Sequence, residues 1–270
     1  MSKIIERLNR LSQGTPQPIG FRALQAESPR PKIQVVASLA QEDAEGLIDF
    51  VAGADAGLLC ISKLKSAAEV LKKLIQAMPD IPWGVQLPEG QTEVKSLTQS
   101  GCDFVVFSAA NTPLTIFDND RVGKILEIET SITESLLRAT NRLPIDGVLF
   151  AREGKPNFLT WQHLMLFQRS ADLLTKPMLV AVPAKLTAGE LQALWEAGAD
   201  GVVIEVTAGQ SHDMLKELRK VINEMTFPLP RRREKPSPLL PRIAEVSTVT
   251  KDKDDEDDEE EEEERRLCLC

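Results

Sequence analysis

Residues 177–206, PMLVAVPAKLTAGELQALWEAGADGVVIEV, hold one complete strand–helix–strand unit, and this unit decides the fold. Two apolar runs, at 178–182 and 201–206, have the length and Val/Ile/Leu content of strands that are buried on both faces. A helical pattern at 187–197 separates them. Strands of this kind joined through a helix predict a parallel sheet.

The same alternation extends back to residue 33. Eight apolar runs are predicted as strands, at 34–39, 57–62, 83–87, 104–109, 125–130, 147–151, 178–182 and 201–206. Helices are predicted between or after them at 44–51, 66–78, 91–100, 133–141, 160–174, 187–197 and 211–225. The stretch 111–123 instead predicts a loop, because it contains Pro113 and Asp118-Asn119-Asp120. Eight such units predict a compact, closed (β/α)8 barrel, and an open doubly wound sheet is the alternative.

The barrel is predicted over residues 33–226, with extensions at both ends. Residues 1–32 comprise an amphipathic helix at 3–12 and a link that contains Gly and Pro. Residues 227–250 form a Pro-rich basic linker, and 251–270 an acidic low-complexity tail that ends Cys-Leu-Cys. Composition of this kind predicts a disordered C-terminus.

The net charge of -9 lies almost entirely in the tail. Residues 251–266 hold twelve acids and four bases, so the rest of the 270-residue chain is nearly neutral. A barrel without a basic surplus is not expected to bind nucleic acid, whereas the acidic tract could recruit a basic protein partner. With no secretory signal and no apolar run long enough for a transmembrane segment, we expect a cytoplasmic protein.

Cysteine and histidine offer few ligands for a metal. Cys60 and Cys102 lie in apolar runs and are predicted to be buried, reduced thiols. No Cys/His spacing indicates zinc. No residue is assigned as a metal ligand, and the cofactor is left unknown. The other two cysteines end the chain, and the two histidines are His163 and His212.

Four aspartates recur just before alternate predicted strands: Asp55, Asp103, Asp146 and Asp200. Each follows a Gly or Pro that ends the preceding segment, as in Gly198-Ala199-Asp200. We interpret them as structural turn residues on the N-terminal face of the barrel, where they form a weak internal repeat.

Strand alternation also predicts which side chains point into the barrel. Glu127, Glu129 and Glu205 face inward near the C-terminal ends of their strands, where such barrels place their chemistry. Burying carboxylates is costly unless they are paired or bind something. We interpret these three as candidate acid–base residues, with a cation site or a Mg²⁺ site of oxygen ligands as further functional interpretations; a structural salt-bridge network is the non-functional alternative. Candidate substrate-binding side chains point inward or follow the strands: Ser38, Lys63, Gln86, Ser108, Arg152 and Lys185.

Residues 176–205 resemble the last quarter of the phosphate-binding, aldolase-type (β/α)8 barrels, such as thiamine phosphate synthase. The resemblance rests on Pro177–Val182 and on Ala197-Gly198-Ala199-Asp200-Gly201-Val202-Val203. It implies the barrel fold and, in the family, a phosphate site made by Gly-Gly after strand seven and Gly-Ser after strand eight. Here Pro183-Ala184-Lys185 and Glu205-Val206-Thr207 stand in those places. Pro offers no amide and a carboxylate repels phosphate, so the chain is interpreted as a degenerate member.

Two functions remain open from the sequence. The first is a small-molecule-binding barrel, a lyase or isomerase that uses the inward carboxylates. The second is a non-catalytic barrel that serves as a scaffold or interaction protein through its charged tails. Whether the chain is an enzyme is therefore left uncertain.

Overall fold

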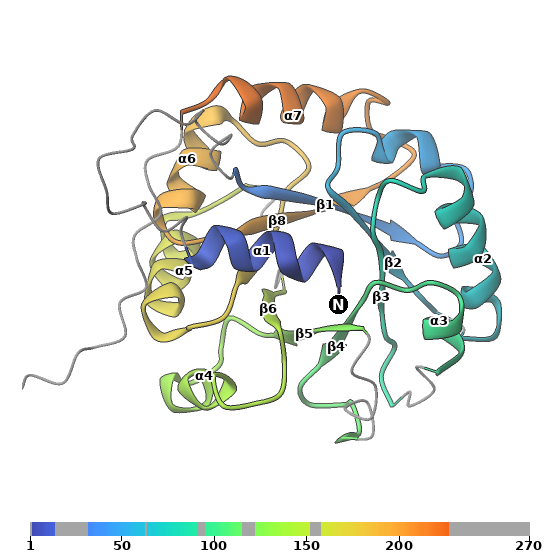
Figure 1. Cartoon of the computed structure of the whole chain (residues 1–270). Helices are drawn as coiled ribbons and strands as arrows, with labels where there is room; N and C mark the ends of the chain where they lie inside the picture. Colours follow the sequence, from blue (N-terminus) through green and yellow to red (C-terminus); the bar gives the residue numbers. More distant parts are fainter. Residues whose placement is uncertain are drawn as a thin grey trace, which may run out of the picture. The chain divides into compact units, whose positions relative to one another are not determined.

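The computed structural model describes residues 2–13, 32–62, 64–90, 95–114, 122–151 and 158–226. Eight parallel strands form a closed sheet in which each strand pairs with the next and β8 pairs with β1, and Figure 1 looks along the barrel. The strands are β1 Gln34–Ala40, β2 Ala56–Cys60, β3 Trp83–Gln86, β4 Phe104–Ser108, β5 Gly123–Ile128, β6 Gly147–Phe150, β7 Met178–Val182 and β8 Gly201–Val206.

The predicted closed barrel is thus confirmed, and the open sheet is wrong. Helices run along the outside of most strands (Figure 1). The helices of the described residues are α1 Lys3–Gln13, η1 Ile48–Val51, α2 Leu64–Ala77, α3 Lys95–Gln99, α4 Glu134–Thr140, α5 Trp161–Leu173, α6 Ala188–Glu196 and α7 Met214–Glu224.

The connection between β1 and β2 differs from the prediction. We expected a helix at 44–51, but only the short 3-10 helix η1 forms there, after a series of turns. Gly46 lies inside the segment, and glycine costs about 1 kcal/mol in a helix interior relative to alanine. The predicted loop between β4 and β5 is only partly testable, because residues 115–121 lie outside the described part of the chain.

Register fixes which side chains fill the barrel. Paired residues on neighbouring parallel strands point to the same side, so the pairs Ser38–Leu58 and Leu58–Gly84 lie on one face. Gly84 is required there, because a Cβ on it would lie 2.3 Å from Cε2 of Phe104. The middle of the interior is aliphatic and buried, and is formed by Val36, Leu58, Val106, Ile125, Leu149, Leu179 and Val203.

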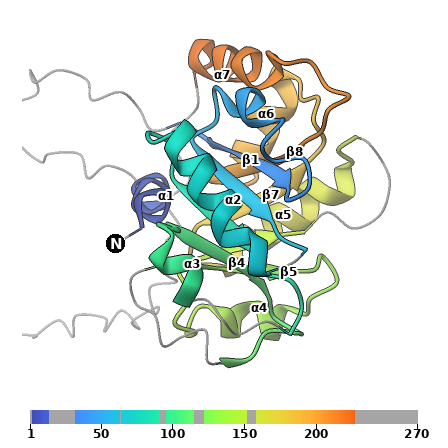
Figure 2. The same cartoon turned by 90° about the vertical axis from the view of Figure 1, so that its right-hand side faces the viewer.

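The helix α1 closes the end of the barrel from which the strands start (Figures 1 and 2). A Cβ added to Gly123, the first residue of β5, would meet Cγ1 of Ile5 at 2.6 Å. The apolar face of α1 is fully covered, with Ile4, Leu8 and Leu11 at most 1% exposed. The sequence predicted this helix but not its position.

Asp103 fixes the start of α1. Its carboxylate accepts hydrogen bonds from the Ser2 hydroxyl at 2.8 Å and from the amides of Lys3 and Ile4 at 2.8 and 3.1 Å. A negative charge at a helix N-terminus is favourable because it meets unpaired amides and the positive end of the helix dipole. One of the four repeated aspartates therefore anchors the closing helix.

The other three aspartates share a second arrangement. Each forms a reciprocal pair of hydrogen bonds with one residue on the preceding odd-numbered strand. The aspartate carboxylate accepts from the backbone amide of that residue, and the aspartate's own amide donates to that residue's carbonyl oxygen. The carboxylate contacts are Asp55 with Val35 at 2.8 Å, Asp146 with Lys124 at 2.8 Å and Asp200 with Met178 at 2.7 Å. The interpretation of these residues as structural turns at the N-terminal face is confirmed.

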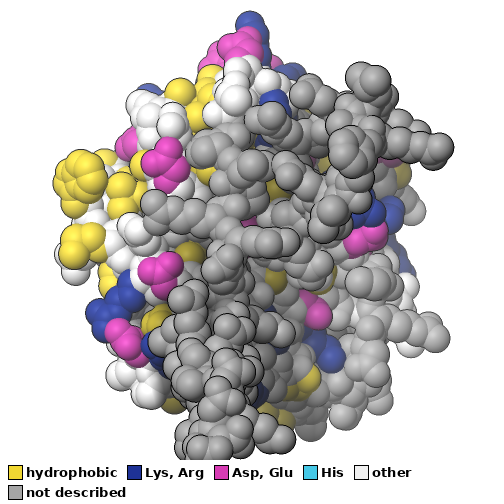
Figure 3. Space-filling model, turned by 60° about the vertical axis from the view of Figure 1, so that its left-hand side comes forward, with side chains coloured by type: hydrophobic (Ala, Val, Ile, Leu, Met, Phe, Trp, Pro, Cys, Tyr) yellow, Lys and Arg dark blue, Asp and Glu magenta, His cyan; other side chains and the backbone are white. Residues whose placement is uncertain are grey.

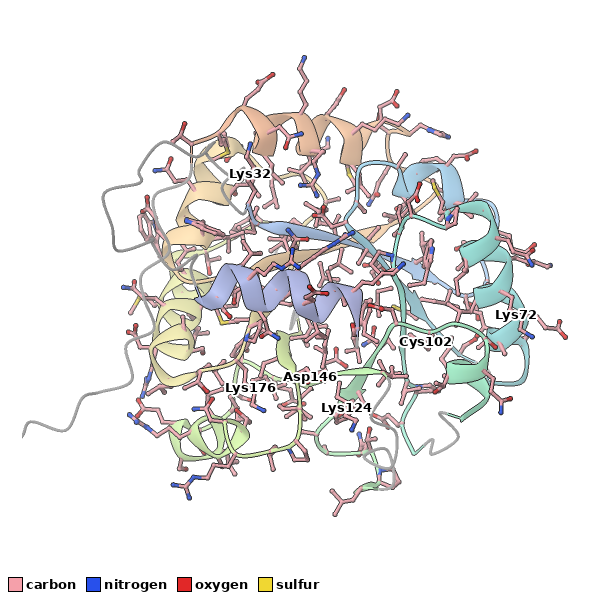
Figure 4. All side chains as sticks on the ribbon, in the orientation of Figure 1. Lys32, Lys72, Cys102, Lys124, Asp146 and Lys176 are labelled. Carbon is pink, nitrogen blue, oxygen red and sulfur yellow. The ribbon has the colours of Figure 1, made fainter. Side chains whose placement is uncertain are left out.

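Lys124, Asp146 and Lys176 lie near one another at this face (Figure 4). The Lys176 ammonium donates to the carbonyl oxygens of Leu143, at 2.6 Å, and Ile145. Burial lowers the pKa of Lys176, and the charge of Asp146 partly opposes this. The cluster holds the segment before β6 against the start of β7, which is a structural task.

The predicted extensions at 227–250 and 251–270, and the link after α1, lie outside the described residues. The chain divides into the units Met1–Lys235 and Pro236–Cys270. Among the described residues, no helix is both long and apolar enough to cross a membrane.

Candidate functional site

An arc of polar side chains lines the C-terminal mouth of the barrel. Cys60, at the end of β2, lies 3.0 Å from the Ser38 hydroxyl on β1 and 3.0 Å from Oε1 of Gln86 on β3. The side-chain nitrogen Nε2 of Gln86 donates in turn to both carboxylate oxygens of Glu127 on β5, at 3.0 Å each. Four strands thus contribute to one hydrogen-bonded chain, which holds the Glu127 carboxylate in place.

The Cys60 thiol gives this chain its direction. Burial raises the pKa of Cys60 above its ordinary value of 9.0; the Ser38 hydrogen bond lowers it, and the charges of Glu127 and Glu205 raise it further. The thiol therefore keeps its proton at neutral pH and donates it to Oε1 of Gln86. With that oxygen occupied, the NH₂ group of Gln86 faces Glu127.

Glu205 belongs to the same mouth. It pairs in register with Ser38 across the junction of β8 and β1, and its charge acts on the Cys60 thiol together with that of Glu127. Ser108 pairs in register with Glu127, and its hydroxyl accepts from the amide of Ala110 at 3.3 Å. The structure thus brings five predicted site residues to one arc, namely Ser38, Gln86, Ser108, Glu127 and Glu205.

Other predicted site residues stand apart from this arc or outside the described residues. Glu129 follows β5, is exposed, and accepts from the Ser131 hydroxyl at 3.1 Å. Lys185 follows β7 and is exposed. Lys63 and Arg152 lie outside the described residues, so their predicted roles remain predictions.

The remaining sector of the mouth, at β6 and β7, is apolar. Ala181 on β7 and Ala151 directly after β6 are the inward positions there, and Pro183 follows β7. They line a small pocket together with Thr130 after β5. The outer wall of this pocket is made by Phe158, Leu159, His163 and Phe167, on α5 and the segment before it. The mouth thus has a polar arc from β8 through β5 and an apolar sector at β6 and β7.

The pocket wall is organised by the start of α5. Thr160 and His163 cap this helix reciprocally: the Thr160 hydroxyl accepts from the His163 amide, and the Thr160 amide donates to Nδ1 of His163 at 3.1 Å. A neutral imidazole therefore carries its proton on Nε2. The ring stacks on Phe167, with centroids 6.3 Å apart.

Apolar side chains also stand on the solvent side of α5. Phe158 is 62% exposed, Trp161 83% and Met165 70%, and Figure 3 shows apolar side chains gathered at the left edge of this face. Trp161 and Met165 are four residues apart, so their side chains lie on one face of α5.

Within the described ranges, no group of three or more His, Cys, Asp or Glu side chains is placed to hold a metal ion.

Two contributors to the mouth were missed from the sequence. Cys60 was interpreted only as a buried thiol, although it continues the inward alternation of Ala56 and Leu58 on β2; Cys102 is buried as predicted. His163 belongs to a helix start whose Thr160 is a typical N-cap residue, but the sequence does not show that this turn covers the apolar sector.

The closed eight-stranded parallel sheet with helices outside it defines the class: a (β/α)8 barrel. Neither a family model nor a curated protein matches the chain. Among solved structures it is similar to a mutant tryptophan synthase alpha-subunit from Pyrococcus furiosus, with a TM-score of 0.58 and 13% identity over 72% of this chain and 98% of that one.

A thiamine phosphate pyrophosphorylase from the same organism is similar to the same degree. Its TM-score is 0.56 and its identity 14%, over 71% of this chain and 96% of that one. These likenesses show the fold and confirm the barrel that the sequence resemblance implied.

Proposed function

We propose that the C-terminal mouth binds a small, cationic or neutral metabolite and that Glu127 acts on it as a general acid or base, in a lyase or isomerase step. The observation that supports this proposal most is that the side-chain nitrogen of Gln86 donates to both carboxylate oxygens of Glu127, at 3.0 Å each. A catalytic base must be held in a fixed geometry, and a purely structural carboxylate would more often be neutralised by a cation.

The second carboxylate sets the charge of the ligand. Glu205 stands beside Ser38, on the other side of the arc from Glu127. A phosphate ester would meet both negative charges, and Pro183 offers it no amide. A cation or an uncharged donor fits this mouth better. Ser38 and Ser108, which lie in the arc, are proposed as further ligand contacts. The roles of Glu129, Lys63, Arg152 and Lys185 remain predictions from the sequence.

A ligand screen followed by substitution tests this proposal. Divalent metals, phosphosugars, flavins and small amines are screened by thermal shift, since a ligand at about 100 times its Kd stabilises a fold by about 2.7 kcal/mol. We expect an amine to give the largest shift and Glu127→Gln to abolish it. Glu69→Gln on the exposed side of α2 is the matched control, because it removes the same charge far from the mouth.

The alternative is a non-catalytic barrel that acts as a scaffold. The replacement of the family's phosphate-binding residues by Pro183 and Glu205 favours it. It predicts that no compound in the screen shifts the melting temperature. A shift that survives in Glu127→Gln would instead place the ligand elsewhere and exclude Glu127 as its partner.

A further inference from the structure

The solvent side of α5 carries a stripe of side chains that takes no part in the mouth of the barrel. The exposed residues of this helix are Trp161, Gln162, Met165, Gln168, Arg169 and Asp172. Trp161 is 83% exposed and Met165 70%. Single apolar side chains on a surface are ordinary, but tryptophan is highly buried on average. Two large apolar side chains one helical turn apart are typical of an interaction surface.

Five of the six exposed positions are arranged symmetrically about Met165. Trp161 and Arg169 lie four residues before and after it, and Gln162 and Gln168 lie three residues before and after it. When two copies of a helix pack antiparallel about a two-fold axis at the middle residue, each position meets the position at the same distance on the other side. The stripe therefore has the symmetry that contact with a second copy of itself requires.

The positions that meet are also chemically complementary. Trp161 of one protomer faces the partner's Arg169, and a guanidinium over an indole ring is a favourable cation–π arrangement. Gln162 faces the partner's Gln168, and an amide side chain both donates and accepts hydrogen bonds. Met165 faces its own copy at the axis, where its flexible thioether adapts to close packing.

Arg169 is oriented by an ion pair within its own chain. Its guanidinium pairs with Glu134 at the start of the neighbouring helix α4, and the two side chains stay 63% and 46% exposed. Arginine pairs with a carboxylate through the N–H groups at its edge and stacks on an aromatic ring through its face. The ion pair with Glu134 and a contact with a second tryptophan ring are therefore compatible.

We propose that α5 is a dimerisation surface, at which two copies of this chain pack α5 against α5, antiparallel, about a two-fold axis at Met165. An aromatic side chain buries about 150–250 Å² when it is covered, so two tryptophans and two methionines form an apolar core of several hundred Å². Standard interfaces bury about 800 Å² per partner. The dimer is therefore weak and forms as the protein concentration rises. The stripe shares no residue with the polar arc, so this inference is independent of the proposed function.

Concentration dependence tests for the dimer directly. The full-length chain is kept reduced, so that Cys268 and Cys270 do not cross-link copies, and sedimentation velocity follows its mass over about a hundredfold concentration range. We expect a monomer at the lower end and a dimer at the upper end. Trp161 gives a second measurement, because Trp83 and Trp195 are buried. Iodide should quench its fluorescence less in the dimer than in the monomer.

An exchange of two side chains tests how the copies pack. Trp161→Arg places like charges opposite each other at both ends of the contact and should weaken the dimer by about tenfold or more. The double variant Trp161→Arg, Arg169→Trp restores a ring opposite each guanidinium and should recover most of the lost affinity. Leu114→Arg is the matched control, because Leu114 is a similarly exposed apolar residue, at 78%, that follows β4. It should leave the dimer unchanged.

Each result decides the inference. Recovery of the dimer in the double variant supports it and shows that Trp161→Arg did not act by misfolding. A monomer at every concentration overturns it. A dimer that resists Trp161→Arg, or that Leu114→Arg weakens equally, uses another surface. If Trp161→Arg dissociates the dimer and the exchange does not restore it, the copies do not pack antiparallel about Met165, and the inference is wrong.

Discussion

Glu127 depends on residues from three other strands for its position. Gln86 holds its carboxylate, the Cys60 thiol donates to Gln86, and the Ser38 hydroxyl lies within hydrogen-bond distance of Cys60. Alternation along each strand predicted that Ser38, Gln86 and Glu127 point inward, because side-chain direction in a strand has a strict period of two. Which of them touch depends on the register between strands, and no pattern within one strand encodes that register.

The buried thiol of Cys102 makes the stability of the fold depend on pH. Burial raises the pKa of Cys102 from its ordinary 9.0 to about 12. Between these values the unfolded chain loses this proton and the folded chain keeps it. Folding stability is therefore fully present below about pH 9 and falls as the pH rises toward 12.

We expect this loss to amount to about 1 kcal/mol between pH 8 and pH 10. Urea unfolding at both values, in the natural chain and in Cys102→Ala, measures it as the difference between their two pH responses. The baseline cost of the substitution cancels in that comparison. An equal decline in both proteins would contradict the assigned titration.

Asp200 tests the repeated turn at the N-terminal face. Its carboxylate accepts from the amide of Met178 at 2.7 Å, in a buried site. We expect Asp200→Ala to lower the free energy of unfolding by about 1–3 kcal/mol, because a buried donor loses its partner. Asp200→Asn keeps an acceptor oxygen and should cost less in the same urea titration. Equal costs for the two variants would mean that charge, and not the hydrogen bond, matters here.

Helices and strands were easier to predict than their neighbours in space. All eight strands formed where the apolar runs stood, since such runs can be buried on both faces only inside a parallel sheet. The helix expected at 44–51 was wrong, because its few residues include Gly46 and yield only the turns that lead into η1. The amphipathic pattern of α1 showed that one face is buried but gave no information about which surface covers it.

The closing helix should be a large contributor to stability. Leu8 on α1 is fully buried, and Leu→Ala substitutions in such sites cost about 2–5 kcal/mol. We expect Leu8→Ala to lose stability in this range, measured by urea unfolding. Glu6→Ala on the exposed side of the same helix should change it by less than about 0.5 kcal/mol. Similarly small effects of Leu8→Ala and Glu6→Ala would show that the packing of α1 against the end of the barrel does not stabilise the fold.

All the described residues of the molecule lie within the unit Met1–Lys235. We expect removal of residues 236–270 to leave the free energy of unfolding unchanged within about 0.5 kcal/mol, because all eight strands and the closing helix are retained. Chemical denaturation of the full and shortened chains provides the comparison. A clear loss would assign the acidic segment a part in holding the barrel together.

The alternation of strands and helices predicted the closed barrel because it requires a parallel sheet with eight members. The division of the mouth into a polar arc and an apolar sector was only half visible in the sequence. Alternation marked Glu127 and Glu205, but Phe158 and His163 belong to the start of α5. The pattern of this helix alone does not indicate which strand ends it lies against.

The helix α1 covers the end of the barrel from which the strands start, where Ile4, Leu8 and Leu11 are at most 1% exposed. Buried aliphatic side chains, among them Val36 and Leu58, fill the interior above it. Under the proposed function, a ligand therefore reaches and leaves the polar arc over the C-terminal ends of the strands. A reaction at that arc would then show competitive inhibition by its own product.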